Sequence, residues 1–203
     1  MARAAPGPVD RDTYADELGD DDPIVVMAET PDRIRKLLRG LTRKQVRARP
    51  APGKWSIQEI VAHLADGEVI LGSRYRFVAA HDRPPLLCSD QDAFAERLGP
   101  LNAEAVDLAD DFAMARAVNL GLFERLPEEA WDRVGIHSER GEESIRDMVA
   151  MYAGHDRHHL SQIETIRTGL FPRAGKKRAA AGKPGPKKPG KKKSGRDRAT
   201  PRR

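Results

Sequence analysis

The sequence has little of what several classes of protein require. It contains a single cysteine, Cys88, so no disulfide can form within the chain and a zinc site built from several cysteines is excluded. It has no run of about 18 apolar residues, the length that a membrane-spanning helix needs. Its first residues, MARAAPGPVDRDTYADELGDDD, lack the apolar stretch of a secretory signal peptide. We therefore expect a cytoplasmic protein that does not interact with membranes.

Charge is distributed unevenly along the chain. Residues 173–203 contain 14 Lys and Arg against one acid, Asp197, which gives this segment a charge of +13. Because the whole chain carries +5, residues 1–172 carry −8. The basic segment consists mainly of Lys, Pro, Ala and Gly, and residues 1–22 are rich in Pro, Gly, Asp and Ala. Neither can bury enough apolar surface to fold, so we expect two disordered tails around one domain at 23–172.

That domain has the residue periodicity of helices. Apolar residues recur at helical spacing in four stretches, and no stretch shows the two-residue alternation of a half-buried strand. The four stretches are residues 23–41, 55–82, 102–126 and 144–169. Four long helices joined by connections of moderate length indicate an all-α protein folded as a four-helix bundle.

Several residues mark the ends of these helices. Ser56 and Glu59 have the spacing of a capping box, in which each side chain accepts from a backbone N–H of the other residue. Ser144 is expected to cap the last helix, and Gly169 to end it in a left-handed conformation. Pro31 is expected to kink or break the first helix.

Three histidines lie where they could bind one metal ion. His155 and His159 are four residues apart in the last helix, so their side chains share one face. His63 lies in the second helix, at the edge of its apolar face. Three neutral imidazoles would leave coordination positions open for water or substrate. Zinc and nickel are our first candidates for the metal, and iron and copper also accept imidazole ligands.

Other residues near these histidines have two interpretations each. Gln162, one turn beyond His159, could orient a bound water or form part of a cavity wall. Tyr152 could donate a hydrogen bond into the site or belong to the core. Asp66 and Glu68 are the acids nearest His63 in sequence, and either could accept a hydrogen bond from an imidazole N–H.

The remaining candidate side chains are expected to lie outside the site. His158 is rotated around the helix from His155, which places it at the surface or behind the ligands. His81 and His137 lie near turns, where we expect them to be solvated. Cys88 follows Pro84 and Pro85 in a loop, and we assign it no catalytic role.

Two segments resemble motifs of a known family. WSIQEIVAHLADGE, starting at Trp55, is similar to the second-helix motif of the DinB/YfiT-like superfamily, and GHDRHHLSQIE, starting at Gly154, is similar to its last-helix motif. The resemblance covers roughly residues 23–170. It implies a bundle with up-down-down-up topology and a divalent metal bound by His63, His155 and His159. Members include thiol-dependent S-transferases, in which the metal helps to activate a low-molecular-weight thiol, and proteins described as metal-dependent hydrolases.

Two kinds of function are compatible with these features. The first is a metal-dependent enzyme, a thiol-dependent transferase or a hydrolase, that acts on a small-molecule substrate. The alternative is a non-catalytic stress or nucleic-acid-associated protein, stabilised by its metal and tethered by residues 173–203. A pocket beside the three histidines would favour the enzyme, and a metal sealed by packing would favour the alternative.

Truncation after Pro172 tests the role of the basic segment. We expect the full-length chain to bind DNA or RNA weakly and without sequence preference, because 14 cationic side chains release counterions from phosphates. Anisotropy titrations at increasing salt should show a steep loss of affinity. The truncated protein, with its charge of −8, should not bind. If the truncated protein binds as tightly as the full-length chain, residues 173–203 are not the tether. If the full-length chain does not bind either, the segment only makes the protein more soluble.

Overall fold

A computed structural model of the chain describes residues 11–170, with side chains from Tyr14 onward. The predicted disorder of residues 1–10 and of the basic segment 173–203 lies outside the described residues.

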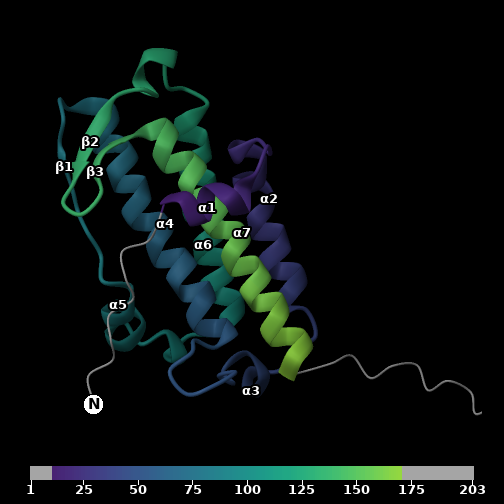
Figure 1. The fold of residues 1–203 in the computed structure, drawn as a ribbon. Coiled ribbons are helices and arrows are strands. Elements are labelled where there is room, and N and C mark those ends of the chain that lie inside the picture. Colours follow the sequence, from purple (N-terminus) through teal and green to yellow (C-terminus); the bar gives the residue numbers. More distant parts are fainter. Residues whose placement is uncertain (1–10, 171–203) are drawn as a thin grey trace, which may run out of the picture. The chain divides into compact units, whose positions relative to one another are not determined.

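Four long helices, α2, α4, α6 and α7, form a bundle (Figure 1). Helices α2 and α7 run in one direction and α4 and α6 in the other, which confirms the predicted up-down-down-up topology. None of the described helices is both long and apolar enough to cross a membrane. The elements are α1 (Arg11–Leu18), α2 (Pro23–Leu38), α3 (Arg43–Val46), α4 (Ile57–Ala80), β1 (Pro85–Leu86), α5 (Gln91–Arg97), η1 (Pro100–Asn102), α6 (Ala105–Phe123), η2 (Glu128–Ala130), β2 (Val134–His137), β3 (Gly141–Ser144) and α7 (Ile145–Leu170).

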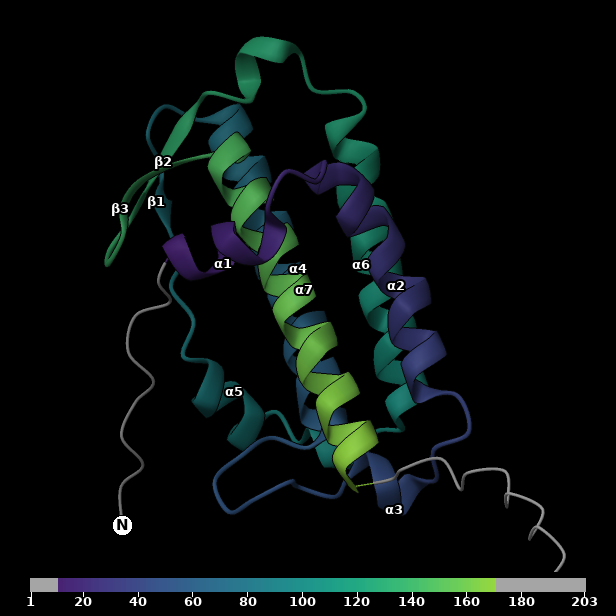
Figure 2. The ribbon, with the colours of Figure 1, turned by 45° about the vertical axis from the view of Figure 1, so that its right-hand side comes forward.

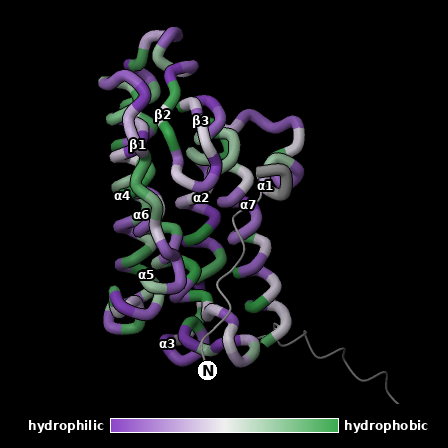
Figure 3. Tube along the Cα trace, turned by 60° about the vertical axis from the view of Figure 1, so that its left-hand side comes forward, coloured by the Kyte–Doolittle hydropathy of each residue, from purple (hydrophilic) through white to green (hydrophobic). Residues whose placement is uncertain are grey.

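Apolar side chains fill the bundle in two clusters. One lies toward the α3 end, where Ile60 and Phe112 are fully buried, and the other lies toward the sheet, where Tyr75 and Met148 are fully buried. Along the long helices hydrophobic and hydrophilic residues alternate as each helix turns (Figure 3). This pattern is what the helical periodicity of the sequence predicted.

A buried guanidinium, that of Arg116 on α6, joins all four long helices. Its Nη1 donates to Asp156 of α7 at 2.7 Å and to the backbone carbonyl of Met27 in α2 at 2.7 Å. Its Nη2 donates to Glu68 of α4 at 2.9 Å, and its Nε lies 2.8 Å from the same carboxylate. All three ionic side chains are at most 2% exposed. Asn119 completes the group by donating to Glu68 at 2.9 Å.

Arg116 also explains why Pro31 does not break α2. Proline has no backbone N–H, so the carbonyl four residues earlier, that of Met27, loses its partner within the helix. The Arg116 guanidinium supplies the missing hydrogen bond. Of the predicted kink or break, the break does not occur, since α2 is continuous from Pro23 to Leu38 with Pro31 inside it.

The expected helix starts are confirmed, and the expected end of α7 is not. Ser56 and Glu59 form the capping box of α4, and Ser144 and Asp147 exchange the same pair of hydrogen bonds at the start of α7. Gly169 lies inside α7 and does not have a positive φ.

Helix α1 lies in a segment for which the sequence predicted disorder. It packs across α7, where Tyr14 is half-buried and Leu18 is buried in the core (Figure 2). Gly154 makes this contact possible, because a Cβ at that position would lie 1.8 Å from the Tyr14 carbonyl oxygen. The prediction was wrong for Arg11–Leu18 because so few apolar residues give no helical periodicity, and docking onto α7 stabilises the helix instead.

A small three-stranded sheet was also not predicted. Strand β1 pairs with β2 in parallel, and β2 pairs with β3 antiparallel. The strands have two to four residues each, too few to show alternation. The sheet lies beside the end of the bundle at which α7 begins, next to α4 and α7 (Figure 1).

Replacement of Arg116 tests the buried ionic group. We expect Arg116→Met to lower the free energy of unfolding by about 3–5 kcal/mol, because it leaves the carboxylates of Glu68 and Asp156 buried without a cation. Urea denaturation followed by circular dichroism measures the change. Arg35→Met is the matched control, since the ion pair of Arg35 with Asp110 is half-exposed and screened by solvent and should contribute far less to stability. Equal losses in the two variants would contradict the assigned role.

Candidate metal centre

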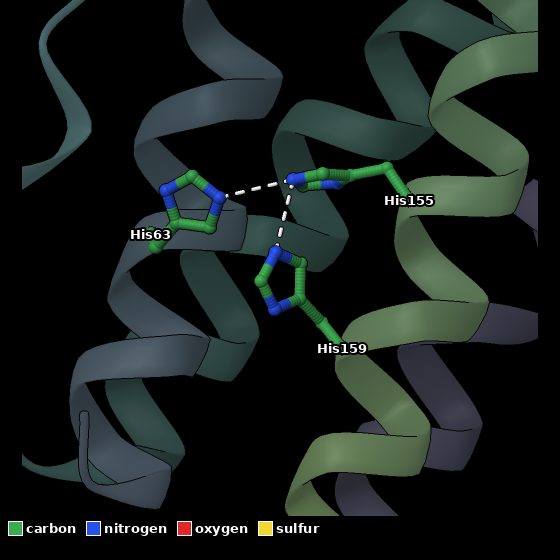
Figure 4. Close-up of side chains that lie close together, drawn as sticks. All are labelled: His63, His155 and His159. Carbon is green, nitrogen blue, oxygen red and sulfur yellow. Dashed lines mark hydrogen bonds between the residues drawn. The ribbon is translucent and has the colours of Figure 1, made fainter. Parts of the chain in front are cut away.

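The three histidines singled out from the sequence come together between α4 and α7 (Figure 4). The Nε2 of His155 lies 3.0 Å from the Nε2 of His63 and 3.0 Å from the Nε2 of His159. One nitrogen from each ring lies within 4.8 Å of the others. Nitrogens that each lie about 2.1 Å from one ion are roughly 3.0 to 3.4 Å apart in octahedral or tetrahedral coordination, so the two 3.0 Å contacts suit a shared metal site.

The bundle positions these rings through the spacing of two helices. His155 and His159 lie one turn apart on α7, and His63 faces them from α4. Helices α4 and α7 touch less than the pairs α4–α6 and α2–α7 do. The rings meet where this looser pair leaves room for them.

Burial keeps all three rings uncharged at neutral pH. It lowers the pKa of His63 to about 4 and holds the pKa values of His155 and His159 well below their usual range. Neutral imidazole is the form that binds metals. The Nε2 of His155 carries either one proton or one lone pair, so it can form a well-directed hydrogen bond with only one of its two neighbours, whereas a shared cation would accept the lone pairs of all three rings.

Gln162 determines which nitrogen of His159 can act as a ligand. Its Oε1, which can only accept, lies 2.9 Å from Nδ1 of His159. The ring proton is therefore on Nδ1, and the lone pair of Nε2 points toward His155. The sequence had suggested a water-orienting or cavity-wall role for Gln162. The structure places it as the hydrogen-bond partner of a histidine, a contact that commonly orients metal ligands.

Three aromatic rings surround the histidines. Trp55, just before α4, has its ring centre 4.9 Å from that of His63 and 6.5 Å from that of His159. Tyr14 of α1 and Tyr152 of α7 contact His155 at 5.2 and 5.4 Å between ring centres. Burial and the neighbouring Tyr152 and Glu17 raise the pKa of Tyr14 to about 12, so its phenol stays protonated. Sequence analysis missed Tyr14 altogether.

The other expectations for neighbouring polar side chains are only partly met. Glu68 binds Arg116 and Asn119 in the core, so it is not the acceptor for His63 that the sequence suggested. No hydrogen bond joins Asp66 to a histidine within residues 11–170, and burial raises its pKa. The hydroxyl of Tyr152 accepts from Arg74 at 3.2 Å, while its ring packs on His155.

The other histidines and the cysteine lie outside the set of three, although the ring of His158 lies next to that of His159, with 5.3 Å between ring centres. His158 packs between Tyr14 and Glu17, and His81 is exposed as predicted. The prediction of a solvated His137 was wrong, because this side chain is only 3% exposed. Its Nδ1 accepts from the backbone N–H groups of residues 139 and 140, and its Nε2 lies 3.4 Å from the Sγ of Cys88.

The histidines are largely enclosed. His155 is 7% exposed and His159 is 5% exposed, while His63 is partly open to solvent. Two surface hollows lie elsewhere, one of about 460 Å³ between α4 and α6 and one around His81 and Arg133. Neither includes a histidine of the set.

Comparison with known proteins gives the family. The sequence model of the DinB superfamily matches residues 27–163, which is most of the described chain. The chain belongs to the DinB superfamily. This result confirms the resemblance seen in the helix motifs around His63 and His155.

Relatives of this DinB-superfamily chain carry names that refer to metal-dependent hydrolysis. A protein of Oceanobacillus iheyensis named "Putative metal-dependent hydrolase" is 28% identical over 134 residues, which is 66% of this chain and 76% of the relative. A protein of Bacillus cereus with the same description is 26% identical over 145 residues, covering 70% of this chain and 82% of the relative.

A solved structure shares the fold. YfiT from Bacillus subtilis, described as "a probable metal-dependent hydrolase with an unusual four-helix bundle topology", superposes with a TM-score of 0.69. The match covers 83% of this chain and 93% of YfiT at 16% sequence identity.

Replacement of His63 tests the candidate centre. We expect the wild-type protein to hold one divalent ion and His63→Ala to lose stoichiometric binding, because removal of one of three ligands leaves only the pair on α7. Metal analysis after gel filtration measures occupancy. His158→Ala is the matched control, since it removes a neighbouring imidazole that lies outside the set. Full occupancy in His63→Ala would show that the ion lies elsewhere.

Proposed function

We propose that this protein is a metal-dependent enzyme that acts on a small organic molecule, with His63, His155 and His159 as the ligands of a divalent metal. The observation that carries the proposal is the convergence of three neutral Nε2 atoms at one point between α4 and α7. The names of the two relatives support metal-dependent hydrolysis as the first reaction to test.

The residues of the centre have distinct tasks in this proposal. The three imidazoles hold the ion, and Gln162 keeps the proton of His159 on Nδ1. The rings of Trp55, Tyr14 and Tyr152 shield the ligands from bulk water. When bound, a divalent ion with three neutral ligands keeps its full charge, so it acidifies a coordinated water or thiol and polarises a carbonyl near it.

The reaction is either hydrolysis of the substrate or transfer of an electrophilic group of the substrate to a thiol. Both need the same uncharged ligand set and differ only in the nucleophile, water in one case and a low-molecular-weight thiol in the other. Within residues 14–170 the one thiol, Cys88, lies beside His137 and outside the histidine set, so a transferase would take its thiol from solution. Zinc and nickel are the metals to load first, followed by iron and copper.

The basic segment supports the non-catalytic alternative. A charge of +13 on residues 173–203 would tether the protein to nucleic acid independently of any metal bound by the histidines. The histidines are largely enclosed and line neither of the two surface hollows described above, and by the criterion set from the sequence this enclosure favours the alternative. In that case the metal would raise the melting temperature and no substrate would be turned over.

An activity screen separates these possibilities. Metal-loaded protein is incubated with a panel of esters, amides and soft electrophiles, with and without glutathione or cysteine. Turnover without thiol would indicate a hydrolase, and conjugate formation that needs thiol would indicate a transferase. We expect turnover to disappear in His63→Ala and after chelation, and to persist in His158→Ala. Metal-loaded protein of confirmed occupancy that turns over nothing, but melts at a higher temperature than metal-free protein, would overturn the enzyme proposal.

A further inference from the structure

Helix α1 crosses α7 at the position of the metal ligands. The two backbones touch at Gly154, the residue before His155, where a Cβ would meet the carbonyl oxygen of Tyr14 at 1.8 Å. Arg157 donates to the carbonyl oxygens of Glu17 and Leu18 at 3.3 and 3.1 Å and also binds the carboxylate of Asp21. Cationic donors at a helix C-terminus stabilise its free carbonyls, so α7 itself holds α1 in place.

This crossing brings Tyr14 onto the ligands. Its ring lies edge-on to His155 at 5.2 Å between centres and next to His158 at 5.7 Å. Tyr14 is half-buried, whereas Leu18, one turn further along, is buried in the core. Leu18 therefore anchors the helix, and Tyr14, one turn before it, contacts the ring of His155.

The other sides of the centre are closed by parts of the bundle itself. Trp55 packs on His63 and His159, and Tyr152 packs on His155 while its hydroxyl is bound by Arg74. Of these three rings, Tyr14 alone comes from a separate helix that packs on the outside of the bundle, since Trp55 directly precedes the N-cap of α4 and Tyr152 lies on α7. The place of Tyr14 therefore depends on the docking of one short helix.

We propose that α1 forms a wall of the metal centre and that Tyr14 is a specificity-determining residue, whose ring limits the size of the molecules that reach the ligands on the α7 side. The inference rests on the proposed metal centre and adds to it a part of the chain that lies outside the bundle. Small organic molecules pass the ring, and bulky ones require α1 to move.

Release of metal to a bulky coloured chelator measures this access. Tyr14→Ala removes the ring, and Gly154→Ala displaces α1 while favouring the helical conformation of α7. We expect both variants to release metal up to about tenfold faster than wild type, which corresponds to the loss of one aromatic contact. Tyr14→Phe keeps the ring and should match wild type. Asp16→Ala, at an exposed position of the same helix, is the matched control.

A second measurement works without any metal. In metal-free protein, diethyl pyrocarbonate modifies accessible neutral imidazoles, and peptide mass spectrometry reports the reaction at each histidine. We expect Tyr14→Ala to react faster than wild type at His155, and equally at the exposed His81. Circular dichroism confirms that each variant keeps its helical content.

The two measurements distinguish failure of this inference from failure of the proposed function. Wild-type protein that takes up no metal contradicts the proposed function, and the modification of His155 still tests the position of Tyr14. The inference is overturned if Tyr14→Ala releases metal and reacts at His155 at the wild-type rates. A faster release in Gly154→Ala would not rescue it, because that substitution lies on α7 and could change α7 itself.

Discussion

The charge of Arg116 is the constraint on which the rest of the structure depends. A guanidinium at 1% exposure cannot remain unpaired in an apolar interior, and its partners come from every other long helix of the bundle. Glu68 fixes α4, the carbonyl of Met27 fixes α2, and Asp156 fixes α7. The group is satisfied only when all four helices are assembled in register, so it specifies one arrangement of the bundle.

The position of the histidines follows from that arrangement. Asp156 is the residue after His155, and neighbouring residues point about 100° apart around a helix. When Asp156 is held by Arg116 in the core, His155 and His159 must face the side on which α4 lies. Glu68 fixes the rotation of α4 in the same way, and His63 lies five residues before it. One buried ionic group thus orients both helices that supply the candidate ligands.

The sequence predicts what local spacing determines. The capping boxes at Ser56 and Ser144 and the shared face of His155 and His159 depend only on residues within one turn, and all of them are found. The convergence of His63 with that pair could not be derived from spacing, because the rings lie 92 residues apart in the chain. It came from the resemblance of two motifs to a family.

Features that depend on distant contacts were missed or wrong. Pro31 has the local chemistry of a helix breaker, and the carbonyl that it leaves free in the continuous α2 is bound by Arg116 from another helix. Helix α1 has too few apolar residues to be recognised, since its stability comes from Gly154 on α7. The strands are too short for any periodicity, and the burial of His137 follows from their pairing.

The segment GHDRHH of α7 combines these constraints in less than two turns. Its six residues face three different surroundings as the helix turns. His155 and His159 face α4, and Asp156 faces Arg116 in the core. The other three residues contact α1: Gly154, Arg157 and His158. A motif that looks like a metal site alone therefore also contains the contacts that fix the bundle and dock α1. Because α1 contacts the same six-residue segment that carries two of the candidate ligands, a displacement of α1 acts directly on the surroundings of His155. The same geometry links access to the centre with the docking of a segment that the sequence alone does not reveal.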